Sequence, residues 1–362
     1  MACRGSRLAV AVAGGMSCLV LVGWYQFPIP VTPSQGTESV SPYALPGTLS
    51  TLSPLDGNTS SPPTPYWTPF QDQDLPDDHG RLLEQALLYA TSSKDYATPS
   101  SSPPAYLAGK TILLIGDSNE RGLVDALCTR LGSYSSVMSS TNPPALSDRW
   151  HADAHTCEIP ALDLRLASFM AFGVLIEEGN DLWSHKVELD GPWSIEERIE
   201  LAKRFMTKWG HPAHLVVFNS NLWDLMFLHD TRLRAHRPYR LSLTRSQART
   251  WIDRASGALS HLRGAFPSSR LSFRTLHPLW PGGPNDFFNS HRTQQLHEAA
   301  RVVLRRAEED GLDVRLLDVG RVLEGMPTTG DARILRDKVH LGWSPGLWMY
   351  SEMMLEALKG RL

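Results

Sequence analysis

The hydrophobic positions of the chain fall into three zones. Residues 8–27 contain no charged side chain and are mostly apolar, whereas residues 28–77 are dominated by Pro, Ser, Thr and Gly. Beyond residue 106, short apolar runs alternate with longer stretches of helical periodicity. This pattern predicts a membrane segment, an extended stem and one folded domain.

The apolar N-terminal run is just long enough to cross a bilayer as a helix, which needs about 20 residues. Arg4 and Arg7 precede it, and no Lys or Arg follows for dozens of residues. The positive-inside rule therefore places residues 1–7 in the cytosol and the rest in the lumen. A cleaved signal peptide has a similar pattern, but no small-x-small cleavage site follows the run. We expect an uncleaved anchor over residues 8–27 and a type II membrane protein of the secretory pathway, in the Golgi, with secretion as the alternative.

Residues 28–105 form the predicted stem. Their Pro- and Ser-rich composition cannot bury enough apolar surface to offset chain entropy, so we expect a disordered segment with a short helix near residues 81–90. Asn58 begins an N-glycosylation sequon, which fits a luminal location. The pattern leaves open whether the helix packs against the folded domain.

Residues 106–362 form the predicted folded domain. Short β-rich runs and longer helical stretches alternate there, an order typical of a single α/β domain with a mostly parallel sheet. The predicted strands are 111–116, 214–219, 270–276 and 313–319. The predicted helices include 194–209, 244–264, 290–310 and 344–359.

Charge and motif content exclude two classes of partner. The chain has 35 Lys and Arg against 38 Asp and Glu, a net charge of −3. Nucleic-acid-binding domains usually carry a concentrated excess of Lys and Arg, so we expect no nucleic-acid partner. The phosphate-loop and G-x-G-x-x-G motifs of nucleotide-binding folds are both missing, and we predict no cofactor.

The first predicted strand ends in Gly116-Asp117-Ser118, where a helix begins. In an open parallel sheet, sites form at this carboxyl edge of the strands. The hydroxyl of Ser118 would be accessible there, and the helix N-terminus would stabilise developing negative charge. The alternative is that Asp117 or Ser118 only caps the helix.

A second candidate group closes the domain. Asp337, three residues before His340, can turn back to bind one imidazole nitrogen and leave the other free to act as a base. A serine is a poor nucleophile without such a base. The alternative is that His340 packs against Trp343 or binds a backbone carbonyl. The pair of motifs at the two ends of the domain is more specific than either alone.

A third block, Asn219-Ser220-Asn221-Leu222-Trp223-Asp224, follows the strand 214–219. Side-chain amides at a strand end can donate hydrogen bonds to an oxyanion, although Asn and Ser also favour turns. Gly173, after another apolar run, could offer a backbone N–H for the same purpose.

These three blocks together resemble the SGNH/GDSL hydrolase superfamily. The N-S-x-L-W-D block, residues 274–278 (Arg-Thr-Leu-His-Pro) and residues 335–337 (Leu-Arg-Asp) are similar to its PC-esterase branch, which includes trichome-birefringence-like and sialate O-acetyltransferase proteins. The resemblance spans roughly residues 106–355 and implies a three-layer, flavodoxin-like fold.

The resemblance also implies roles for individual residues. Ser118 would be the nucleophile, His340 the general base and acid, and Asp337 the carboxylate that orients the imidazole. The Ser118 N–H, Gly173 and either Asn219 or Asn221 would form the oxyanion hole, since the superfamily's G-x-N-D block aligns with both asparagines. We expect the substrate cleft to include Asp117, Arg121, Trp223, His277 and Trp343.

The positions of cysteine and histidine raise two further questions, a disulfide and a metal site. Cys128 and Cys157 would lie in an oxidising compartment, which permits one disulfide; two free thiols are the alternative. His151, Asp153, His155 and Cys157 alternate and would share one face of a strand, as metal ligands can. No second cluster supports such a site, so we favour a polar loop and predict no metal.

The sequence therefore predicts a membrane-anchored luminal enzyme that transfers acyl groups of glycans through an acyl-serine. Water as the acceptor would make it an esterase, and a sugar hydroxyl would make it an O-acetyltransferase; the residues do not choose between them. Acetyl-CoA is cytosolic, so a luminal transferase would need a separate protein to supply acetyl groups. The alternative is a non-catalytic glycan-binding or scaffolding module of the same fold.

Overall fold

The computed structural model describes residues 47–52, 64–69, 78–95, 102–138, 154–176, 194–234, 242–279, 290–324, 326 and 334–360. The chain divides into two compact units, 1–38 and 39–362, and all of these residues belong to the second. The predicted anchor over residues 8–27 and the sequon at Asn58 lie outside the described residues. Within the ranges given above, no helix combines the length and the apolar character that a membrane span requires.

A seven-stranded sheet forms the centre of the fold, with the strand order β4-β5-β6-β3-β7-β8-β9. The strands β6, β3, β7, β8 and β9 run parallel to one another, whereas β4 and β5 add an antiparallel edge beside β6. This arrangement confirms the predicted α/β fold with a mostly parallel sheet. The bounds are β3 (Lys110–Gly116), β4 (Ser136–Met138), β5 (Ala154–Ile159), β6 (Leu164–Met170), β7 (Leu215–Phe218), β8 (Arg270–Arg274) and β9 (Val314–Leu317).

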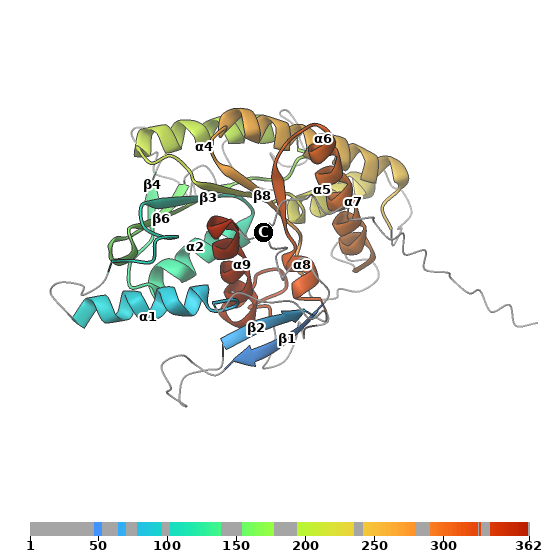
Figure 1. Cartoon of the computed structure of the whole chain (residues 1–362). Helices are drawn as coiled ribbons and strands as arrows, with labels where there is room; N and C mark the ends of the chain where they lie inside the picture. The colour runs from blue at the N-terminus through green and yellow to red at the C-terminus, as the bar shows by residue number, and fades with distance from the viewer. Residues whose placement is uncertain are drawn as a thin grey trace, which may run out of the picture. The chain divides into compact units, whose positions relative to one another are not determined.

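Helices cover both faces of this sheet (Figure 1). Alternate side chains of β3 point to opposite faces, so Ile112 and Leu114 enter one apolar core while Leu113 and Ile115 enter the other. The first core includes α1 (Leu82–Asp95), α2 (Ser118–Arg130) and α9 (Trp348–Lys359). The second includes α4 (Ile195–Trp209), α5 (Leu222–Arg234), α6 (Arg245–Ala265) and α7 (Ser290–Glu309). The short helices are η2 (Pro160–Leu162), α8 (Val319–Val322) and the π-helical turn η3 (Trp343–Leu347).

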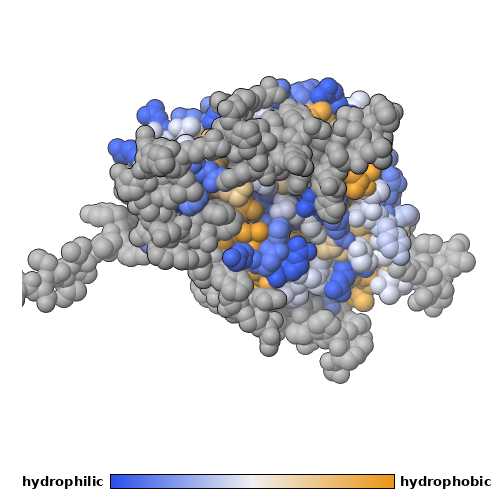
Figure 2. Space-filling view, turned by 180° about the vertical axis from the view of Figure 1, so that it is seen from behind, coloured by the Kyte–Doolittle hydropathy of each residue, from blue (hydrophilic) through white to orange (hydrophobic). Residues whose placement is uncertain are grey.

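Polar and apolar residues are mixed on one face of the described part of the chain. On the face shown in Figure 2, hydrophilic residues in blue and pale tones surround smaller groups of apolar residues in orange. Among the described residues, the large apolar side chains with most exposure are Tyr134 and Val137, next to or within the edge strand β4.

The segment predicted as a disordered stem contains ordered elements, and here the structure differs from the sequence prediction. Strands β1 (Gly47–Leu52) and β2 (Thr64–Pro69) pair as an antiparallel hairpin that lies beside α8 and α9. Helix α1 is longer than predicted, and Leu82, Leu83, Ala86 and Ala90 are buried against the domain. These residues form one apolar face of the helix, which the average composition of the segment conceals.

A buried carboxylate fastens α1 to α9. The two carboxylate oxygens of Glu352 accept hydrogen bonds from the first backbone N–H groups of the helix, Leu82 N and Leu83 N, at 2.8 Å each. Burial raises the pKa of Glu352 to about 8, and the nearby carboxylates of Glu356 and Asp78 act in the same direction. These two backbone donors lower the pKa, but the cost of desolvation is larger.

We predict that thermal stability falls as the pH rises from about 5 to about 8. A carboxyl group whose pKa is higher in the folded state contributes stability that is complete below the unfolded pKa and is lost as the pH passes through the folded pKa. The expected decrease in Tm is roughly 8–16 °C. Calorimetry across this range should show a flatter profile for Glu352→Gln, and an equally steep profile would contradict the assignment.

Candidate active site

Three side chains from the two ends of the domain form one hydrogen-bonded chain. The hydroxyl Oγ of Ser118 lies 2.7 Å from Nε2 of His340. The other ring nitrogen of His340, Nδ1, lies 2.9 and 2.8 Å from the two carboxylate oxygens of Asp337. The structure thus brings together the predicted nucleophile, base and orienting carboxylate, although Ser118 and His340 are 222 residues apart in the sequence.

The carboxylate of Asp337 is held in its charged form. Partial burial raises its pKa, but the backbone N–H groups of Val339 and His340, which donate to Oδ1 at 3.0 and 2.9 Å, outweigh that effect. The resulting pKa is about 2, so Asp337 is ionised at neutral pH. An ionised partner at Nδ1 fixes the tautomer in which Nε2 can accept the proton of Ser118.

The helix that begins at Ser118 is capped by its neighbour. The side chain of Asp117 accepts from the N–H of Asn119 at 2.7 Å, and Glu120 accepts from the N–H of Asp117 at 2.8 Å, which completes a capping box. Asp117 therefore caps the helix, as the alternative predicted. The hydroxyl of Ser118 does not take part in the cap and contacts His340 instead. The Ser118 N–H, at the positive end of α2, has no acceptor among the described residues, so it can donate to an oxyanion.

A cleft of about 550 Å³ opens beside Ser118 and His340. One wall is a face of α2, with Ser118, Asp125 and Arg130 along it, and the opposite wall is the segment from Leu335 to Leu347. Twelve residues of α-helix separate Ser118 from Arg130, so the cleft runs for about 18 Å at 1.5 Å per residue. Its size and length suit an extended ligand.

Trp343 lines this cleft, as predicted for a substrate-binding residue. The guanidinium of Arg130 lies 5.0 Å from the centre of its ring, and Trp348 packs edge-to-face at 5.8 Å. The two contacts hold the indole in place on the cleft wall.

Beneath Ser118, a fully buried ionic network joins the carboxyl ends of three parallel strands. Arg274, at the end of β8, donates from Nε to Oε1 of Glu120 at 2.6 Å, and its Nη2 lies 3.6 Å from Asp117. Tyr350 of α9 donates to the same oxygen of Glu120 at 3.0 Å. Burial lowers the pKa of Arg274, but the carboxylates of Glu120 and Asp117 raise this pKa by a larger amount. The guanidinium therefore stays charged. Asp117 therefore belongs to this network and not to the predicted cleft.

Asn219 and Asn221 also belong to the buried network. The amide Nδ2 of Asn219 donates to Asp117 at 2.8 Å and to Glu120 at 3.3 Å. The amide Nδ2 of Asn221 donates to Asn219 at 2.7 Å and to the carbonyl of Arg274 at 3.3 Å. Both amide donors are thus committed to internal acceptors. These donors satisfy buried acceptors that would be costly to leave unpaired, and the oxyanion role of either asparagine stays a prediction.

Gly173 follows β6 in a conformation that favours glycine, with φ of +97°. A Cβ atom there would lie 2.4 Å from Oδ1 of Asp224, a sterically impossible distance. Asp224 is itself buried, which raises its pKa to about 6, and it accepts from Leu175 N at 2.9 Å and from Trp251 Nε1 at 2.9 Å. Close packing on Asp224 accounts for the glycine, and its oxyanion role stays a prediction.

The remaining predicted cleft residues lie outside the cleft lining. Trp223 packs edge-to-face on Phe172 at 5.3 Å within an apolar cluster. Arg121 is half-buried, and desolvation lowers its pKa. His277 is fully buried, and its Nε2 lies 2.9 Å from the carbonyl oxygen of Val339.

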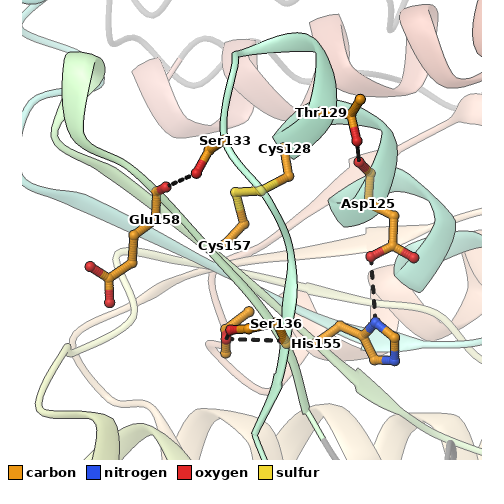
Figure 3. Close-up of a disulfide and its surroundings, with 9 residues drawn as sticks. Asp125, Cys128, Thr129, Ser133, Ser136, His155, Cys157 and Glu158 are labelled. Carbon is orange, nitrogen blue, oxygen red and sulfur yellow. Dashed lines mark hydrogen bonds and ion pairs between the residues drawn. A yellow bond between two sulfur atoms is a disulfide. The ribbon is translucent and has the colours of Figure 1, made fainter.

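Cys128 of α2 and Cys157 of β5 form a disulfide (Figure 3). It joins the helix that carries Ser118 to the antiparallel edge of the sheet. The sulfur of Cys157 is therefore not available as a thiolate ligand, and His151 and Asp153 lie outside the described residues. In the ranges that the structure describes, no three His, Cys, Asp or Glu side chains are grouped as metal ligands would be.

Sequence reasoning missed the partners that support the triad. Sequence reasoning assigns no role to Asn119 or Glu120, and Arg274 enters it only as part of the motif at residues 274–278. Two signals point to them: the D-x-x-E spacing of a capping box at residues 117–120, and an arginine that ends a strand otherwise rich in buried side chains.

Comparisons with known proteins yield remote structural similarity only. No protein-family profile matches the chain, and no curated protein matches it. It is similar to the structure of a GDSL-like lipase from Bacteroides thetaiotaomicron, with 10% identity, 76% of this chain and 98% of that chain covered, and a TM-score of 0.36. It is also similar to a carbohydrate esterase family 3 protein from Talaromyces cellulolyticus (14% identity, 69% and 99% covered, TM-score 0.37) and to an acetylxylan esterase from Geobacillus stearothermophilus (13%, 70% and 96%, 0.37). At this level of similarity, we take function from the site alone.

Proposed function

We propose that the chain is a serine esterase or O-acyltransferase of the SGNH type that acts on acyl esters of glycans. The observation that carries the proposal is the chain of hydrogen bonds from Ser118 through His340 to Asp337 at the edge of an open cleft. A hydroxyl at 2.7 Å from an imidazole that is oriented by a carboxylate is the arrangement that activates a serine nucleophile.

In the proposed reaction, the Ser118 oxygen attacks the ester carbonyl while Nε2 of His340 takes its proton. The charged Asp337 stabilises the imidazolium, and the Ser118 N–H at the start of α2 stabilises the oxyanion. Collapse of the tetrahedral intermediate breaks the ester bond, and the leaving oxygen takes the proton from His340. An acceptor hydroxyl then attacks the acyl group while His340 accepts its proton. The bond between the acyl group and Ser118 breaks, and the serine oxygen takes that proton from His340.

The acceptor decides between the two activities within this proposal. Water gives a hydrolase and a sugar hydroxyl gives a transferase, with the same residues in the same roles. A transferase in the lumen would depend on a separate protein that supplies acetyl groups, because acetyl-CoA is cytosolic.

A glycan substrate is supported by the cleft. Its length of about 18 Å and its lining of an indole, a carboxylate and guanidinium groups suit a chain of sugars better than a small ester. The motif of residues 274–278 supports assignment to the PC-esterase branch. The apolar run of residues 8–27 supports a type II membrane protein of the Golgi with this domain in the lumen.

A fluorophosphonate probe tests the nucleophile. We predict that the full chain is labelled at neutral pH, that Ser118→Ala abolishes labelling, and that His340→Ala slows it by roughly 10²–10⁴-fold, the usual contribution of a general base. Asp337→Asn should slow labelling less than His340→Ala, because the carboxylate acts only through the imidazole. Labelling is measured by gel fluorescence over time.

The matched control is Ser260→Ala, at an exposed serine of α6 on the other side of the sheet. It should be labelled at the wild-type rate. Absence of labelling in the folded wild-type chain would contradict the enzyme proposal and favour a non-catalytic glycan-binding module.

A second prediction concerns the substrate class. Trp343→Ala should lower kcat/KM for an acetylated oligosaccharide about tenfold more than it lowers kcat/KM for p-nitrophenyl acetate, because only the longer substrate reaches the indole. Trp343→Phe, which keeps an aromatic ring, should recover most of the difference. Equal losses on both substrates would show that the distal part of the cleft does not bind glycan.

A further inference from the structure

The catalytic base lies on a turn that is open to solvent. The side chain of His340 is 28% exposed and that of Asp337 is 46% exposed. Asp337 belongs to the same turn, so its hydrogen bonds to His340 order the turn internally but do not fix it relative to Ser118. The 2.7 Å approach of Ser118 and His340 therefore requires contacts between the turn and the body of the domain.

One such contact comes from Asn119, the residue after the nucleophile. Its Oδ1 accepts from the N–H of Leu341 at 2.9 Å, and its Nδ2 is 3.3 Å from the carbonyl oxygen of Val339. Leu341 and Val339 flank His340 on its two sides. A single buried side chain on α2 thus holds the backbone of the catalytic turn both before and after the imidazole.

The second contact comes from His277, which is buried in the domain beneath the turn. Its Nε2 lies 2.9 Å from the carbonyl oxygen of Val339, so this nitrogen carries the hydrogen and donates. Its Nδ1 faces Nη1 of Arg274 at 3.4 Å, and it must be the acceptor because a guanidinium only donates. Burial lowers the pKa of His277 to about 3, with the charge of Arg274 acting in the same direction, so the ring stays neutral. Only one tautomer satisfies both neighbours.

We infer that Asn119 and His277 are positioning residues, which together hold the carbonyl of Val339 and thereby set the distance from His340 to Ser118. This inference rests on the proposed function of the triad. Through Arg274, which contacts both His277 and the cap of α2, the two halves of the triad are placed by one connected set of buried side chains. His277 thus acts through Val339 and not on the substrate.

The test replaces His277 with a side chain that cannot donate and with one that can. His277→Leu removes the donor at similar volume, whereas His277→Gln places an amide N–H where Nε2 was. With the full chain and p-nitrophenyl acetate, we expect kcat to fall roughly 10–100-fold in His277→Leu with little change in KM, because a misplaced base slows proton transfer. His277→Gln should recover most of kcat.

The matched control is Leu262→Ala, a fully buried residue of α6 in the other core. It should lose stability in urea without a comparable fall in kcat. Wild-type kcat in His277→Leu, no recovery in His277→Gln, or an equal kcat loss in Leu262→Ala would overturn the inference. If His277→Leu does not fold, Asn119→Ala is expected to give the same selective fall in kcat, and an unchanged kcat there would overturn it.

Proton NMR separates this inference from the proposed function. The N–H of Leu341, which donates to Oδ1 of Asn119 where the turn meets α2, should keep its signal after transfer into deuterated water in the wild type and in His277→Gln, and it should lose that signal faster in His277→Leu. This readout does not depend on turnover. An inactive wild type that keeps this signal would count against the enzyme proposal alone, whereas an unchanged rate of signal loss in His277→Leu would count against the positioning role.

Discussion

The ion pair between Arg274 and Glu120 is the interaction on which the site depends. The pair is fully buried at the carboxyl edge of the sheet. The side chains that form it or donate hydrogen bonds to Glu120 come from α2, the ends of β7 and β8, and α9. Breaking a buried pair by removal of one partner typically costs 3–5 kcal/mol, because the other charge is left unpaired. The network therefore fixes the start of α2, and with it Ser118, relative to the loops that follow the other strands.

The same network explains how an exposed turn can hold His340, the proposed catalytic base. A turn open to solvent has few contacts that hold it in place. In the proposed mechanism, however, His340 must lie at the edge of the cleft to contact a substrate. Hydrogen bonds from buried side chains to the turn's backbone reconcile the two needs. The disulfide adds a covalent link between α2 and the sheet at the other end of the cleft wall.

The sequence predicted the parallel sheet because its strands are short, apolar and separated by helical stretches. It predicted the triad because Ser118 follows the first strand of the sheet at its carboxyl edge, and because Asp337 and His340 form a local D-x-x-H motif before the last helix. It could not predict the partners of Asn219, since hydrogen bonds between residues about 100 positions apart leave no local pattern. It left the docking of α1 open because a few well-spaced apolar side chains are hidden by the surrounding Pro- and Ser-rich composition.

The central claim is that Ser118 carries the acyl group during turnover, and trapping that intermediate tests it most directly. The full chain would be mixed with p-nitrophenyl acetate, quenched with acid within the first turnover and digested for mass spectrometry. We predict an acetyl group on the peptide that contains Ser118, at the serine itself, and its absence in Ser118→Ala. An active protein that shows no acetyl group on Ser118, or one on another residue, would contradict the account.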